Sequence, residues 1–186
     1  MPSLAWFTPL PPASTGVARY NVELLPGVAA SHPIDVFIDG DPGAVSAPAG
    51  VARVFSAHDF VWKHERQPYD LVVYQMGNAP CHDYMWAYVV RYPGLAVLHD
   101  GQMHHARARS LMLQRRDEDY RAEFLFNHPD AEPDLAELTI AGMLGPLTHF
   151  WPMRRTVIEA SRLVVVHNAW LAARIRDEHP LADVRV

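Results

Sequence analysis

Three short apolar runs constrain the fold of this 186-residue chain more than any other feature of its sequence: residues 71–74, 95–98 and 163–166 (LVVY, LAVL and LVVV). Each run lacks helical spacing, and strands that are apolar at every position are typical of parallel sheets buried on both faces. Segments with helical spacing separate the runs, as in βαβ units. The sequence therefore predicts one α/β domain over residues 1–186, a doubly wound, mainly parallel sheet with helices on both faces.

Shorter patterns predict the remaining elements. Further strands are expected at residues 4–7, 34–38, 51–55 and 184–186, and the strand around residues 71–74 extends over 69–75. Helices are expected after Gly16 and at residues 81–92, 154–160 and 170–178. Residues 103–147 have a helical pattern that residues 127–133 interrupt, so we expect two or three helices there. The strands at 4–7 and 95–98 should lie near the centre of the sheet.

Residues 3–25 (SLAWFTPLPPASTGVARYNVELL) read as a strand, a proline-rich loop and a helix. Ser14 and Thr15 are candidate N-caps, and Gly16 lies where the first helical turn begins. A glycine at such a turn lets a ligand approach the backbone, where free N–H groups and the helix dipole favour an anion. The alternative is that Gly16 only permits a tight turn, and the spacing does not separate the two interpretations.

Ligands of parallel α/β sheets bind beyond the carboxyl ends of the strands. The segments to inspect are therefore residues 8–16, 75–78, 99–102 and 167–169. His99 directly follows a strand, and an imidazole there could hydrogen-bond a sugar hydroxyl or transfer a proton near neutral pH. The alternative is a histidine that caps the strand by bonding a backbone carbonyl. We expect Asp100 to form a turn rather than to act as a base.

Six residues have side chains that bind zinc or iron in other proteins: His82, Asp83, His99, Asp100, His104 and His105. The chain has no HExxH motif, and adjacent histidines point to different faces of a helix. We therefore expect no metal. Three other histidines, His128, His149 and His179, are expected to be solvated. Three tryptophans, Trp86, Trp151 and Trp170, are expected to lie in the core.

Composition excludes several classes of protein. The net charge of −5 without a basic block argues against nucleic-acid binding. The single cysteine, Cys81, allows no internal disulfide, and no secretory signal pattern precedes the first strand, so we expect a cytoplasmic protein. Arginines and carboxylates alternate over residues 107–123, which indicates a solvated helical face. The alternative is that the arginines of residues 107–116 meet an anionic acceptor or a membrane surface.

Three stretches together resemble the N-terminal domain of retaining glycosyltransferases of family four, which have the GT-B architecture. They are FTPLPPASTGVARYNVELL at the start, LAVLHDG around His99, and RLVVVHNAWLAARI near the end. The resemblance implies a Rossmann-like domain on the acceptor side of an enzyme that transfers a sugar from a nucleotide-activated donor with retention of configuration. It implies no metal, and it implies a second, donor-binding domain of the same protein beyond Val186, without which this chain should be inactive.

The resemblance also assigns residues. Gly16 matches the loop glycine near the donor diphosphate, and we expect its neighbour Thr15 to belong to the same loop. His99 matches the catalytic histidine that reaches the donor sugar from the acceptor side. His167 and Asn168 match the edge between the two domains, where they are expected to bind the donor. Residues 103–151 look like an insertion that concerns the acceptor, which would be a sugar, a lipid-linked group or a small molecule. Peripheral contact with the inner face of a membrane fits such an acceptor.

Two other functions remain open at this point. The first is a flavodoxin-like binding or regulatory domain without catalysis, which needs no second domain. The second is a metal-dependent hydrolase built on His99 and Asp100.

Overall fold

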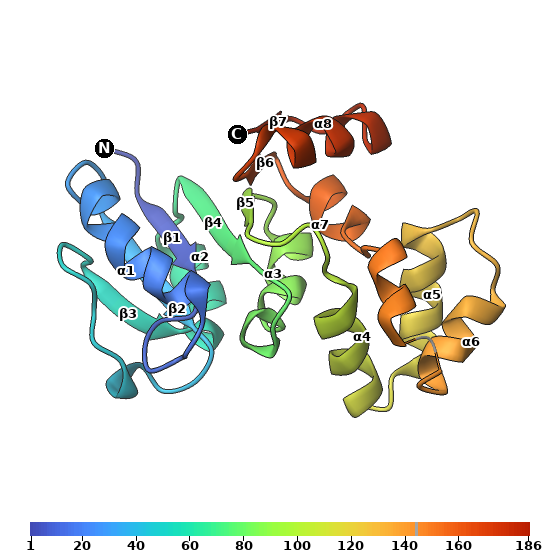
Figure 1. The fold of residues 1–186 in the computed structure, drawn as a ribbon. Coiled ribbons are helices and arrows are strands. Elements are labelled where there is room, and N and C mark those ends of the chain that lie inside the picture. The colour runs from blue at the N-terminus through green and yellow to red at the C-terminus, as the bar shows by residue number, and fades with distance from the viewer. Residues whose placement is uncertain (144) are drawn as a thin grey trace.

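The computed structural model describes residues 1–143 and 145–186 and shows an α/β fold with a seven-stranded, all-parallel sheet (Figure 1). The strand order is β3-β2-β1-β4-β5-β6-β7, so β4 is central and β1 and β5 flank it, as the sequence predicts. The strands are β1 (Leu4–Phe7), β2 (Ile34–Ile38), β3 (Arg53–Ser56), β4 (Leu71–Met76), β5 (Leu95–Leu98), β6 (Leu163–Val166) and β7 (Val184–Arg185).

Eight α-helices connect or flank these strands: α1 (Gly16–Ala29), α2 (Phe60–Arg66), α3 (Met85–Arg91), α4 (His104–Leu113), α5 (Asp117–Asn127), α6 (Asp134–Ile140), α7 (Arg155–Ala160) and α8 (Ala169–Glu178). Short 3₁₀ turns are η1 (Pro42–Ala44), η2 (Ala57–Asp59), η3 (Pro80–His82) and η4 (Gly145–Phe150). The interrupted pattern after residue 103 corresponds to three helices and one 3₁₀ turn, in agreement with the prediction.

The two faces of the sheet bury separate cores, and β1 shows the division. Leu4 and Trp6 pack with Leu25 of α1 on one face. Ala5 and Phe7 belong to the core of the opposite face, to which α2, α3, α7 and α8 contribute their buried side chains. Alternate residues of a strand point to opposite faces, so an apolar run of four residues supplies both cores. Helices on both faces are therefore confirmed.

The structure corrects some details of the sequence interpretation. Helix α2 was not predicted, because its seven residues bury only Phe60 and give little periodicity. The helix expected at 81–92 is split into η3 and α3, with Pro80 at the start of the 3₁₀ turn. Trp170 is 69% exposed rather than in the core, because α8 buries its opposite side. His128 is half-buried rather than solvated and packs against the Phe124 ring at 5.4 Å.

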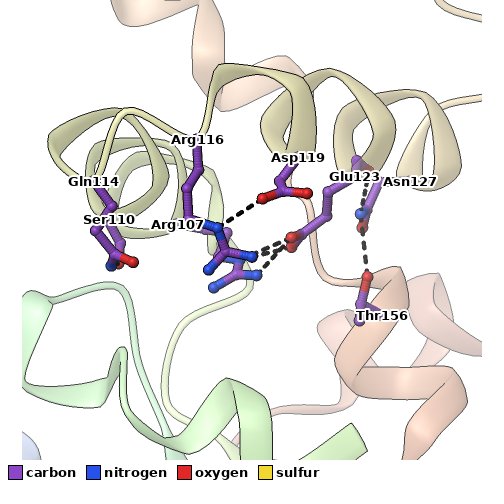
Figure 2. A network of polar contacts seen from close by, with 8 residues as sticks. All are labelled: Arg107, Ser110, Gln114, Arg116, Asp119, Glu123, Asn127 and Thr156. Atoms are coloured by element: carbon purple, nitrogen blue, oxygen red, sulfur yellow. Dashed lines mark hydrogen bonds and ion pairs between the residues drawn. The ribbon is translucent and has the colours of Figure 1, made fainter.

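Helices α4, α5 and α6 form a helical layer beside the sheet (Figure 1), with its own small core around Leu111, Tyr120 and Phe124. Figure 2 shows the polar contacts that join it together. Arg107 of α4 donates from Nε and Nη2 to both carboxylate oxygens of Glu123 of α5, at 2.7–2.9 Å, and both side chains are largely buried. The Asn127 amide donates to Thr156 Oγ1 of α7.

The arginines of this layer are mostly paired within the protein. Arg116 bonds Asp119, and Arg121 bonds Glu118 and Glu137. These contacts favour the solvated, ion-paired interpretation of residues 107–123 over an anion-binding one. None of the helices in the described part of the chain is long and apolar enough to cross a membrane.

The Arg107–Glu123 pair generates a stability prediction. We expect Arg107→Met to lower the free energy of unfolding by about 2–4 kcal/mol, because it leaves the Glu123 carboxylate with little water and no partner. Arg116→Met is the matched control: its ion pair with Asp119 is exposed (49% and 56% of the two side chains), so we expect a loss below about 1 kcal/mol. Urea denaturation measures both, and equal losses would contradict the prediction.

The helical layer also generates a prediction about acid. Burial lowers the pKa of His104, and burial followed by the charge of neighbouring His104 lowers the pKa of His128 to about 4. Between about pH 6.5 and 4 the unfolded chain then binds more protons than the native one, so stability falls as the pH falls. We expect a lower melting temperature at pH 5 than at pH 7.

His128→Gln tests this assignment. This substitution should reduce the acid-induced loss of unfolding free energy by roughly 1 kcal/mol, a value discounted for the solvent that reaches the half-buried ring. His58→Gln is the control, because His58 is exposed, and it should leave the loss as in the wild type. If the two variants lose the same stability between pH 7 and pH 5, His128 does not contribute to acid sensitivity.

Candidate functional site

Three neighbouring strands present polar side chains at one edge of the sheet. Gln75 is the last residue but one of β4, His99 directly follows β5, and His167 directly follows β6. The parallel register pairs Gln75 with Val97 and Leu98 with Val166, so the carboxyl ends of these strands lie side by side. The sequence predicts this edge as the ligand site, and the structure brings His99 and His167 together there.

Hydrogen bonds connect the three side chains in a row. His99 Nε2 lies 2.6 Å from Gln75 Oε1, and His167 Nε2 lies 3.1 Å from His99 Nδ1. An amide oxygen only accepts, so in this arrangement His99 Nε2 carries the proton and donates it. Burial, with smaller contributions from His167 and His82, lowers the pKa of His99 to about 4, so the ring is neutral at pH 7.

The end of β4 is fixed by a second histidine, His82 of η3. Its Nδ1 donates to the backbone oxygen of Gln75 at 2.8 Å, and its ring is buried. A Cβ atom on Gly77 would lie 2.8 Å from His82 Nε2, which is closer than such contacts occur. Gly77 therefore makes room for the ring that holds the strand end. Burial lowers the pKa of His82, which keeps it neutral as well.

Helix α1 places an aromatic ring against the histidine pair. The Tyr20 ring packs edge-on against both histidines, and its centroid lies 5.0 Å from that of His99 and 5.5 Å from that of His167. Buried Asn21 holds the helix to the sheet, since its Oδ1 accepts from Trp6 Nε1 at 2.8 Å. Gly16 lies one helical turn before Tyr20, and residues four apart share a face of a helix. The N-terminus of α1 is therefore on the same side of the helix as Tyr20, one turn before the ring that contacts the histidines.

The loop residues Thr15 and Gly16 have separate roles. Thr15 is the N-cap of α1, and its hydroxyl oxygen accepts from the Ala18 N–H at 3.1 Å. Gly16 is exposed, has no positive φ, and a Cβ there would meet no atom within 4 Å. A tight turn therefore does not require glycine at this position. What the site offers is an open helix N-terminus whose first backbone N–H groups are accessible to an anion.

Asn168 and Asp100 stabilise local structure. Asn168 caps α8, with its Oδ1 accepting from the Leu171 N–H at 2.8 Å, so this oxygen is not free for a ligand. Asp100 forms the expected turn, since its Oδ1 accepts from the Gln102 N–H at 2.8 Å. Asn168 thus lies at the predicted edge, and its role there is to anchor the start of α8 beside His167.

The candidate metal ligands do not gather in one place. Among the residues that the structure describes, no three His, Cys, Asp or Glu side chains come close enough to share an ion. His104 is buried in the helical layer, where Nδ1 donates to the Thr148 oxygen and Nε2 accepts from the Tyr120 hydroxyl.

A cleft lies away from the strand edge, and no sequence pattern indicated it. It has a volume of about 1050 Å³ and lies between α7, α8 and the segment that follows α5. Its charged groups are four arginines and four carboxylates, Arg154, Arg155, Arg162, Arg174, Asp130, Glu159, Glu178 and Asp183. Several are already paired, such as Arg154 with Glu178 and Arg155 with Glu159. We place the candidate site at the strand edge because that edge offers polar groups without charged partners.

Gln75 lies in the segment 75–78 that the sequence analysis selected, but no role was assigned to it, and Tyr20 was missed as a site residue. The signal for Gln75 is one amide near the end of an otherwise apolar strand, and Tyr20 shows only the spacing of a helical residue.

Comparison with protein-family models, curated proteins and solved structures finds no match to this chain.

The two glycines of the site generate opposite expectations. We expect Gly77→Ala to destabilise the protein by about 1–3 kcal/mol, because the new methyl group displaces the buried His82 ring. Gly16→Ala should leave the free energy of unfolding unchanged or raise it by up to ~1 kcal/mol, since alanine favours the helix and meets no atom. Thermal melts measure both. A destabilised Gly16→Ala variant would show that the backbone of this turn requires glycine after all.

Proposed function

We propose that this chain is the acceptor-side domain of a retaining glycosyltransferase that uses a nucleotide-activated sugar. The observation that carries the proposal is the contact of Tyr20, one helical turn beyond the α1 N-terminus, with the His99–His167 pair at the carboxyl edge of a parallel sheet. A nucleotide-sugar has an anionic diphosphate next to a ring of hydroxyl groups. The edge offers helix N–H groups for the first and imidazoles for the second.

The proposed chemistry divides between two halves of the protein. The departing diphosphate needs positive charge, and the oxocarbenium-like centre needs shielding from water. This chain supplies the open helix N-terminus at Gly16 and the hydrogen-bonded pair of His99 and His167. A second domain that closes over the edge would supply the remaining charge and exclude water. The acceptor would be a sugar, a lipid-linked group or a small molecule, and binding needs no metal in this proposal.

A binding or regulatory domain without catalysis is the second candidate, and one observation favours it. Both ring nitrogens of His99 have hydrogen-bond partners inside the protein, so His99 is not presented as an open acid or base. The two candidates make different predictions for this chain. A binding domain binds its ligand tightly by itself, whereas half of a transferase binds the donor weakly and transfers nothing.

The test is binding of UDP-glucose and GDP-mannose to the 186-residue chain, monitored by NMR chemical-shift changes. We expect dissociation constants on the order of millimolar, about −4 kcal/mol, with the changes concentrated at residues 14–20, 99–102 and 167–169. Gly16→Val should weaken binding severalfold, because its side chain covers the helix N–H groups. Gly27→Val is the control, since Gly27 lies in the same helix and also has open space around it.

Four outcomes would count against the proposal. Shift changes confined to the cleft between α7 and α8 would place the ligand elsewhere. Equal effects of Gly16→Val and Gly27→Val would remove the role of the helix N-terminus. Turnover by this chain alone would show that it is not half of an enzyme, and micromolar affinity without turnover would favour the binding domain.

A further inference from the structure

The hydrogen-bond row Gln75–His99–His167 determines which nitrogen of the histidine pair is open. His99 donates from Nε2 to Gln75 Oε1, and its Nδ1, the acceptor of a neutral ring, lies 3.1 Å from His167 Nε2. His167 Nε2 must therefore carry a proton and donate it. Both nitrogens of His99 are then occupied, and the nitrogen left with a free lone pair is His167 Nδ1.

Burial of the side chains decreases along the row from Gln75 to His167. Gln75 is fully buried, His99 is half-buried, and His167 is exposed. No hydrogen bond to His167 Nδ1 is present within the described residues. The row therefore leads from the core of the sheet to a single acceptor atom at the surface of the site.

The surroundings hold His167 in this orientation. Tyr20 packs edge-on against its ring from α1, and the His99 ring lies 4.7 Å away, centroid to centroid. The next residue, Asn168, caps α8 and so fixes the backbone on the other side. A side chain held from three sides presents Nδ1 in one direction, which is the pre-organisation that a binding contact needs.

We propose that His167, through Nδ1, is the residue that contacts the ligand and accepts a hydrogen bond from one of its hydroxyl groups, whereas His99 and Gln75 are positioning residues that set the tautomer of His167. The assignment of a sugar hydroxyl rests on the proposed function. The tautomer does not, because it follows from the three side chains alone. This changes the expectation from the sequence, in which His99 reaches the donor sugar and His167 binds the donor at the edge between the two domains.

The tautomer is tested first, without any ligand. Long-range ¹H–¹⁵N NMR spectra of the ¹⁵N-histidine-labelled chain at pH 7.5 should show both His99 and His167 protonated at Nε2. Gln75→Leu removes the acceptor and should shift His99 toward a mixture of tautomers. Gln114→Leu, at an exposed position of the helical layer, is the control and should leave both rings unchanged. Protonation of His99 at Nδ1 would overturn the proposal, because His167 Nε2 would then be the acceptor.

The contact is tested by binding of UDP-glucose and GDP-mannose to four proteins. His167→Ala should weaken binding about 3–10-fold, as expected for the loss of one neutral hydrogen bond. His167→Asn should restore most of the affinity, because its amide oxygen can take the place of Nδ1. His99→Gln keeps a donor toward Gln75 and should give an intermediate loss. Circular dichroism and thermal melts confirm that each variant is folded.

The outcomes separate the two proposals. A larger loss for His99→Gln than for His167→Ala would make His99 the contact and overturn this inference. Absence of wild-type binding to either nucleotide-sugar would overturn the proposed function and the sugar contact with it. The tautomers of His99 and His167 measured by NMR would still decide whether His99 and Gln75 act as positioning residues.

Discussion

Gln75 is fully buried in β4, the central strand, so its amide depends on partners inside the protein. The backbone oxygen of Gln75 accepts from His82, and the side-chain oxygen accepts from His99. The first bond fixes where the strand ends, and the second fixes a ring of the neighbouring strand. The arrangement of the site thus depends on a single polar residue in an apolar strand. In this orientation Gln75 Nε2 has no partner among the described residues, which is a cost that the row of hydrogen bonds must offset.

The site also depends on two layers that pack from opposite sides. On one face, the buried bond between Trp6 and Asn21 holds α1 so that Tyr20 reaches the histidines. On the other side, Asn78, just beyond β4, accepts from the Ala106 N–H through Oδ1 and so joins the helical layer to the same strand end. Neither layer provides the reactive groups. Each limits how far the strand ends can move, which keeps three side chains from three strands within hydrogen-bonding distance.

The sequence predicted the elements that depend on local or periodic signals. Apolar runs identified β4, β5 and β6, and the polar residues before a periodic segment gave two N-cap candidates for α1, Ser14 and Thr15, of which Thr15 is the N-cap. It also identified the edge at which His99 and His167 meet, because parallel strands end together. It selected the segment 75–78 but assigned no role to Gln75, which bonds a residue 24 positions away through a register that no local pattern reveals. His128 was misjudged for the same reason, since the Met153 backbone N–H that donates to its Nε2 comes from a distant part of the chain.

The site does not coincide with the cleft between α7 and α8, and charge explains why the edge is the better candidate. An anion entering this cleft would compete with carboxylates that already hold three of its four arginines, as Glu178 holds Arg154 and Arg174. Breaking such pairs costs as much as a new pair gains. At the strand edge the donors are backbone N–H groups of a helix N-terminus, which have no carboxylate to release. The His99 ring, whose pKa burial lowers, and its partner His167 suit hydroxyl groups rather than a second charge. A ligand that joins an anion to a polyol therefore matches the edge and not the cleft.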